Sequence, residues 1–332
     1  MESTSNASTV KYSGLFTFKF SLKSGLFLIL LASYSFLTYK ILTFDHYREL
    51  AVQWKQMPLT QLWWFAGVFT LLPVNWFLEA LKWKIMTRHV QKINLNSSVQ
   101  AVLSGISTGF FTPNRVGELV GRVALLHPEN RKAGITLSMI NSLTQNLIMA
   151  LCGIPACLFY FSFTDGKLHP DVEHLVFLVL MGILLFGTIY FSLPVWSRHL
   201  NSSRLSGKIK TFTDCLTYYN RNDLLQVMGV SLVRYGVFCF QFYCMLQFFG
   251  VALTPWQALL AIPTTYLFVT FTPSFAFSEV AVRSSYAVLI IGAFSGQVIG
   301  IALAGVCIWV VNFVLPMLAG SVIMVKKKQY GL

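Results

Sequence analysis

The chain has 332 residues, of which 55% are hydrophobic and only 11% are charged. A soluble domain carries about 25% charged residues, so this composition predicts a membrane protein and excludes a soluble enzyme or binding module. The formal net charge of +13 does not indicate nucleic-acid binding, because the basic residues gather at the ends of apolar segments rather than on one basic domain.

Six apolar stretches are long enough to cross a bilayer as helices, which takes roughly 20 residues each. They cover residues 24–43, 61–81, 134–161, 174–195, 224–250 and 296–324. A tail of residues 1–23 precedes them, and a basic tail of residues 325–332 follows them. The predicted fold class is therefore an all-α polytopic membrane protein with six transmembrane helices.

Two further apolar segments, 98–127 and 255–294, are each interrupted by a proline motif and by charged residues. Broken backbone at membrane depth is tolerated only inside protein or beside a water-filled cavity. We therefore expect both segments to form re-entrant hairpins, which enter the membrane and return to the side they came from.

The distribution of Lys and Arg tests this topology. With the N-terminus in the cytoplasm and both hairpins returning, 19 of the 25 basic residues fall in cytoplasmic segments and 5 in outer segments, while Arg234 lies within a span. This excess agrees with the positive-inside rule. We expect a multi-pass protein of the plasma (inner) membrane with both termini in the cytoplasm.

One short motif occurs twice, about half a chain apart. Each copy is Phe-Thr-Pro, followed by a Glu and, four residues later, by an Arg. The first copy is Phe111, Thr112 and Pro113 with Glu118 and Arg122, and the second is Phe271, Thr272 and Pro273 with Glu279 and Arg283. Matched charges in two halves of a membrane chain are typical of transporter repeats. We expect two inverted repeats, 24–161 and 174–324, each with three helices and one hairpin.

The motif residues have two possible roles. Pro113 and Pro273 lack a backbone donor and suit the first turn of a helix, so each should end one arm of its hairpin and start the other. In the second arm, Glu and Arg share one helix face and should face inward, because charge near the bilayer centre is costly. In the first role, Arg122, Arg283 and the helix N-termini attract an anionic head group, and the glutamates gate, balance charge or carry protons. In the second role, each Glu–Arg pair holds its hairpin together.

Two more arginines are candidates. Arg234 lies in the middle of a span, where an ionisable residue is a functional hypothesis; the alternative is a buried partner for Glu79 or Glu279. Arg115 is a candidate phosphate contact, and its alternative is a solvated charge at the cytoplasmic face. No Cys or His spacing suits a metal, so we expect neither a metal nor a cofactor.

At these residues the chain resembles the transmembrane region of lysylphosphatidylglycerol synthases, a flippase-like family. The resemblance covers nearly the whole chain and implies that Pro113, Gly117 and Pro273 shape the hairpins. It rests on Thr112, Pro113, Arg115, Gly117, Glu118 and Arg122, on Lys82 and Trp83 as a pair closing the second span, and on Pro273, Glu279 and Arg283. In fused members a soluble domain makes the lipid and the membrane region is implicated in moving it. No such domain fits in this chain, so the resemblance implies translocation rather than synthesis.

The leading hypothesis is a translocase for a lipid or a lipid-linked anionic or phosphate-bearing substrate, and not an enzyme. The head group would meet Arg115, Arg122, Arg234 and Arg283, with Glu118 and Glu279 beside them. One alternative is an intramembrane transferase or hydrolase that uses the two glutamates as acid and base. Another is a non-transporting scaffold for a membrane or peripheral biosynthetic enzyme.

Overall fold

The computed structural model describes residues 58–110, 112, 115–164, 171–202, 214–274 and 276–329, and also Ser35, Thr38, Tyr39 and Leu42. All regular secondary structure within these residues is helical, as the sequence predicts. The tail at 1–23, Pro113 and nearly all of the expected first span at 24–43 lie outside the described residues.

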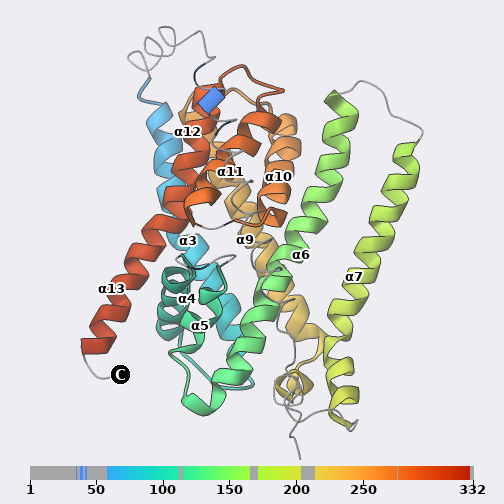
Figure 1. The fold of residues 1–332 in the computed structure, drawn as a ribbon, viewed down its shortest axis with the longest axis vertical. Helices are drawn as coiled ribbons and strands as arrows, with labels where there is room; N and C mark the ends of the chain where they lie inside the picture. The colour runs from blue at the N-terminus through green and yellow to red at the C-terminus, as the bar shows by residue number, and fades with distance from the viewer. Residues whose placement is uncertain are drawn as a thin grey trace, which may run out of the picture.

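Five long helices form the body of the described part. They are α3 (Gln61–Thr87), α6 (Arg131–Thr164), α7 (Asp171–Ser202), α9 (Arg221–Phe248) and α12 (Val298–Trp309), which continues through the π-helical turn η4 (Val310–Val314) into α13 (Leu315–Gln329). All five are long and apolar enough to cross a membrane, so the chain is a multi-pass membrane protein. Figure 1 shows them alternating in direction along the chain, as successive crossings must.

Several helices extend beyond the predicted spans. Helix α3 continues to Thr87, past the predicted end at residue 81, and α13 continues into the predicted tail as far as Gln329. Short 3-10 turns, η2 (Pro128–Asn130) and η3 (Asp214–Tyr218), precede α6 and α9. The extension of α3 matters most, because it moves charged residues from a helix end to its interior.

Two pairs of shorter helices occupy the segments predicted as hairpins. The first pair is α4 (Leu95–Phe110) and α5 (Gly117–Val123), and the second is α10 (Pro255–Phe271) and α11 (Ala276–Ile291). Helix α10, the longest, has 17 residues and so measures about 25 Å, less than the roughly 30 Å hydrocarbon core. In Figure 1 the first pair lies in the lower half of the molecule and the second in the upper half.

Helices α3 and α4 correspond to α9 and α10 at one shift in sequence. Glu118 and Glu279 are 161 residues apart, and the same shift moves α3 onto residues 222–248, against Arg221–Phe248 for α9. It moves α4 onto 256–271, against Pro255–Phe271 for α10. Matched helices run in opposite directions in Figure 1: α3 descends where α9 ascends, and α6 ascends where α12 and α13 descend.

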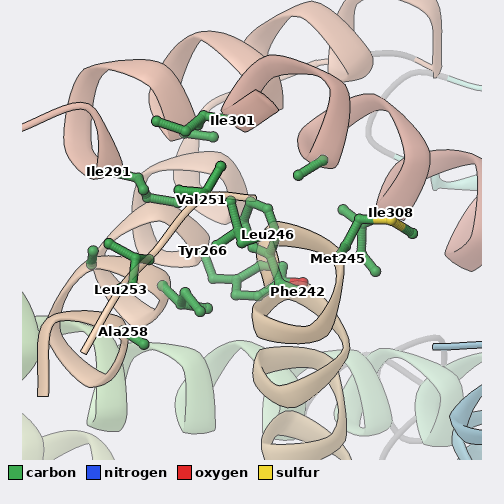
Figure 2. Close-up of a cluster of buried hydrophobic side chains, with 14 of the residues drawn as sticks. Phe242, Met245, Leu246, Val251, Leu253, Ala258, Tyr266, Ile291, Ile301 and Ile308 are labelled. Atoms are coloured by element: carbon green, nitrogen blue, oxygen red, sulfur yellow. The ribbon is translucent and has the colours of Figure 1, made fainter. Parts of the chain in front are cut away.

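Two clusters of buried apolar side chains fill the two ends of the bundle. Figure 2 shows the upper cluster, where side chains of α9, α10, α11 and α12 interdigitate around Phe242 and Tyr266. The lower cluster surrounds Trp83 and includes Leu137 of α6. Helix α3 contributes Leu72 to the upper cluster and Trp83 to the lower one. The stretch of α3 between them also carries the buried polar side chains of Asn75, Glu79 and Lys82.

Helices α4 and α5 approach closely through glycines. A Cβ on Gly121 would lie 2.6 Å from the carbonyl oxygen of Ser104, and one on Gly105 would lie 2.6 Å from Cγ of Arg122. Real Cβ atoms do not approach backbone oxygens this closely, so Gly121 is required where α5 crosses α4. Small residues at such crossings let membrane helices pack backbone to backbone.

Gly121→Ala is therefore expected to lower the stability of the protein by about 1–3 kcal/mol, the usual effect of overpacking a close contact. The measurement is the melting temperature of the purified protein in mild detergent. Gly229→Ala is the matched control, because a Cβ there meets nothing within 4 Å and alanine favours the helix. Equal melting temperatures for the two variants would contradict the proposed crossing.

Candidate functional site

Four long helices carry a polar side chain at mid-length. Each of the four lies near the middle of its span: Asn75 is residue 15 of 27, Gln145 is residue 18 of 35, Arg234 is residue 14 of 28 and Asn312 is residue 15 of 28. Arg234 joins them: its Nε donates to Asn75 at 2.7 Å and its Nη1 donates to Gln145 at 3.3 Å. Asn75 in turn donates to Asn312 at 3.0 Å. These residues form a connected polar layer at mid-length of the helices, between the two apolar clusters.

Glu79 of α3 lies at the centre of this polar layer. Its carboxylate pairs with Arg122 at 2.5 Å, Arg234 at 2.8 Å and Lys82 at 3.3 Å, and it accepts a hydrogen bond from Asn141 of α6 at 2.8 Å. Glu79, Lys82 and Arg122 are at most 3% exposed. Removing one partner of such a buried pair leaves an uncompensated charge, so this one carboxylate ties α3 to α5, α6 and α9.

The first hairpin delivers its charged pair through local hydrogen bonds. The N–H of Gly117 donates to the hydroxyl of Thr112 at 2.8 Å, and its carbonyl accepts from Thr108 of α4 at 2.8 Å. A Cβ on Gly117 would clash with the Thr108 carbonyl, which gives this glycine the shaping role that the resemblance implies. Glu118 and Arg122, on the short helix that follows, form the predicted i,i+4 ion pair.

The second hairpin repeats the pair and connects to the first. Arg283 contacts Glu279 at 2.9 Å, again at i,i+4. The other oxygen of Glu279 accepts from Arg115 of the first hairpin at 2.6 Å. Arg115 has φ 58, a left-handed conformation that is uncommon for a residue other than glycine. The two motif regions, 164 residues apart in sequence at this contact, therefore meet through one ion pair.

The π-helical turn η4 places an aromatic ring beside this pair. The guanidinium carbon of Arg115 lies 3.6 Å from the ring centroid of Phe313, and that of Arg283 lies 5.3 Å from it. Arginines at these distances interact favourably with the ring face. Because the same turn holds Asn312 in the polar layer, η4 contacts both the layer and the hairpin pair, and π-helical turns often occur at functional sites.

A small pocket joins the two sets of charges. It is lined by the charged side chains of Arg115, Glu118 and Glu279 and by the apolar ones of Ile106, Phe110, Trp309 and Phe313. In this conformation it has room for about one water molecule. The acids of both hairpins thus face one space together with the arginine that links them.

The family model for the lysylphosphatidylglycerol synthase transmembrane region matches residues 25–320. The chain belongs to this family. The match confirms the resemblance drawn from the motif residues. No curated protein and no solved structure matches the chain, so the lysylphosphatidylglycerol synthase transmembrane family and the geometry above are what bear on function.

Sequence reasoning named most residues of the site. The structure brings together all six predicted binding residues: Arg115, Glu118, Arg122, Arg234, Glu279 and Arg283. It also shows that Arg234 is a partner of Glu79, one of the two partners considered for it. Arg115 pairs with Glu279 and lies over Phe313, while its side chain is 36% exposed.

Two predictions about local structure were wrong. Lys82 and Trp83 do not close the second span; both are 0% exposed inside α3, because Glu79 of the same helix and the side-chain oxygen of Gln145 in α6 compensate Lys82. Pro273 does not lie in the first turn of a helix. It is in the connection between α10 and α11, and α11 starts at Ala276. Thr272 before it is extended, with ψ 117, as a residue before proline prefers.

The site carries excess positive charge. Within the described residues, the polar layer and the pocket hold five basic side chains, Lys82, Arg115, Arg122, Arg234 and Arg283, and three acidic ones, Glu79, Glu118 and Glu279. The Nε and Nη1 atoms of Arg122 and the Nε of Arg283 are buried without a hydrogen-bond partner in this part of the chain. Surplus positive charge and unused donors favour an anion over a cation as the group that binds here.

Glu79→Gln is expected to destabilise the protein by about 3–5 kcal/mol, because it leaves three buried cations facing a neutral amide. Arg234→Gln should cost less, since Glu79 keeps Arg122 and Lys82. Melting temperatures in detergent test this order. Glu129→Gln, at an exposed glutamate, is the charge-matched control, and an equal effect of Glu79→Gln and Glu129→Gln would refute the central role of Glu79.

Proposed function

We propose that this chain is an integral membrane translocase for a lipid or lipid-linked substrate with an anionic, phosphate-bearing head group. The observation that carries the proposal is the ion pair of 2.6 Å between Arg115 and Glu279. It joins two hairpins from opposite ends of the bundle (Figure 1) at a site with surplus positive charge. Converging segments with interrupted helices are typical of transporters whose repeats move about a central site.

The proposed architecture has six transmembrane helices and two re-entrant hairpins, arranged in two inverted repeats. The correspondence at a shift of 161 residues and the opposite directions of matched helices support the inversion. The short hairpin helices, based at opposite ends of the molecule, support re-entry from opposite sides. Transport would then be a rocking of one repeat against the other around the pocket.

The proposed orientation places both termini in the cytoplasm of the plasma (inner) membrane. Four basic residues that the sequence count assigned to loops lie at the polar layer or beside the pocket instead: Lys82, Arg115, Arg122 and Arg283. They are therefore removed from the count of Lys and Arg on each side of the membrane. Without them the cytoplasmic segments keep 16 of the 25 basic residues and the outer ones 4. The excess still has the same direction, so the positive-inside rule still supports this orientation.

We propose translocation rather than synthesis as the activity. Among the described residues no group of three or more His, Cys, Asp or Glu side chains is gathered as metal ligands would be. The acids of the site are each paired with arginine, an arrangement that suits charge balance more than acid catalysis. The substrate is the principal partner, and a membrane or peripheral biosynthetic enzyme that supplies it is a further proposed partner.

Single cysteines flanking each hairpin are expected to report its re-entry. In a chain cleared of native cysteines, Lys92→Cys and His127→Cys flank the first hairpin, and Ala252→Cys and Ala293→Cys flank the second; all four positions are exposed. A membrane-impermeant maleimide added to intact cells should label only the second pair. Opposite labelling within either pair would mean that its hairpin crosses the membrane.

Glu118→Gln and Glu279→Gln are expected to reduce transport at least tenfold, because each removes a charge from the pocket, while the protein still inserts. The measurement is movement of tail-labelled phosphatidylglycerol across proteoliposomes, read as protection from a membrane-impermeant quencher, with and without a proton gradient. Glu129→Gln is the control and should transport like the wild type. Unchanged transport in both pocket variants would overturn the proposal, and conversion of the lipid into a new product would replace it with an enzyme.

A further inference from the structure

Arg115 differs from the other basic residues of the site in being accessible. Its side chain is 36% exposed, whereas those of Arg122, Arg234 and Arg283 are 3%, 15% and 6% exposed. It lines the pocket, and its guanidinium carbon lies over the ring of Phe313, 3.6 Å from the centroid. A planar guanidinium with one face on an aromatic ring still offers its edge, the geometry that binds phosphate through two parallel hydrogen bonds.

The partner of Arg115 can be replaced without leaving a bare charge. Glu279 bonds Arg115 through Oε2 and Arg283 through Oε1. If Arg115 turned to another anion, Glu279 would keep its pair with Arg283, and the positive surplus of the site would fall. By contrast, Arg122 shares Glu79 and Glu118 with a buried network, so exchange there would break several buried contacts at once.

The backbone of Arg115 also favours exchange. A left-handed conformation at a residue other than glycine costs of order 1–3 kcal/mol and persists only where the surroundings enforce it. Among the described residues, the bond to Glu279 and the ring of Phe313 hold the side chain, and the backbone N–H donates to the carbonyl of Thr112 at 3.2 Å. Breaking the bond to Glu279 releases part of that constraint. Opening this ion pair therefore costs less free energy than opening an ion pair without backbone strain.

We propose that Arg115 is an exchangeable anion site, in which the phosphate of the substrate displaces the carboxylate of Glu279. The inference rests on the proposed function and assigns the first contact with the head group to the guanidinium of Arg115. The conformation described above is the closed state, with Glu279 occupying the place of the phosphate. Binding of phosphate frees Glu279 from the first hairpin. Recognition of the substrate and separation of the two hairpins therefore occur in the same step.

The exchange makes an unusual prediction: removing a charged residue from the site should strengthen binding. The probes are dioctanoyl phosphatidic acid, dioctanoylglycerol with the same tails but no phosphate, and inorganic phosphate. Binding to the purified full chain in mild detergent is measured for the wild type, Glu279→Gln, Arg115→Gln and the double variant. Glu279→Gln should bind phosphatidic acid about tenfold more tightly, since its competitor is gone, a change of about 1.4 kcal/mol.

The double variant makes the test specific. The gain should vanish when Arg115→Gln is added, and dioctanoylglycerol should show no gain in any variant. Glu279→Asp is the second variant, because it keeps a negative charge for Arg283 while shortening the reach to Arg115; it should also bind more tightly. Melting temperatures verify that each variant is folded. A gain that persists without Arg115, or no gain in either Glu279 variant, overturns the exchange.

The outcomes separate this inference from the proposed function. If the wild type prefers phosphatidic acid but the Glu279 variants do not improve on it, the exchange is wrong and the anionic substrate stands. If no variant distinguishes phosphatidic acid from dioctanoylglycerol, both are wrong. An equal gain for inorganic phosphate would support the exchange and identify a soluble phosphate, rather than a lipid head group, as its ligand.

Discussion

The buried carboxylate of Glu79 is the constraint on which the rest of this structure depends. Charge inside a membrane helix is costly, and α3 buries two charged side chains, Glu79 and Lys82. Both must face protein, and both need partners that α3 cannot supply alone. The partners come from α5, α6 and α9, so satisfying one carboxylate fixes how three other elements lie against α3. The apolar clusters above and below then pack around that arrangement.

The same requirement explains why the site sits where it does. Two carboxylate oxygens cannot satisfy three cations, and the Nε and Nη1 of Arg122 stay without a hydrogen-bond partner among the described residues. Uncompensated donors at mid-depth are stable only if an anion or water reaches them. The positive surplus is therefore a consequence of the packing as well as a means of recognition. It also argues against a sodium-type coupling ion at Glu79, whose oxygens already face three positive charges.

Much of this could be predicted from sequence, and the failures share one cause. Apolar length located the five described spans, and broken apolar segments located both helix pairs. The i,i+4 pairs were predictable because they are local. Lys82 was predicted to close a span, and for Glu79 only Arg234 was considered as a partner, because their other partners are distant: Arg122 is 43 residues from Glu79. Sequence patterns report what a helix needs from its surroundings, but they do not say which distant segment provides it.

The repeat symmetry is broken at this point, which gives the two hairpins different mechanical roles. The residue 161 positions after Glu79 is Phe240, which is 52% exposed, so at this position of α9 no carboxylate takes the place of Glu79. Arg122 ties the first hairpin to α3 through Glu79. The ion pairs of Glu279 among the described residues are with Arg283 of its own helix and with Arg115. Once Arg115 exchanges its partner, no described ion pair of Glu279 holds the second hairpin to the rest of the molecule. The exchange therefore removes the ion pair that joins α11 to the first hairpin, whereas Arg122 keeps α5 paired with α3.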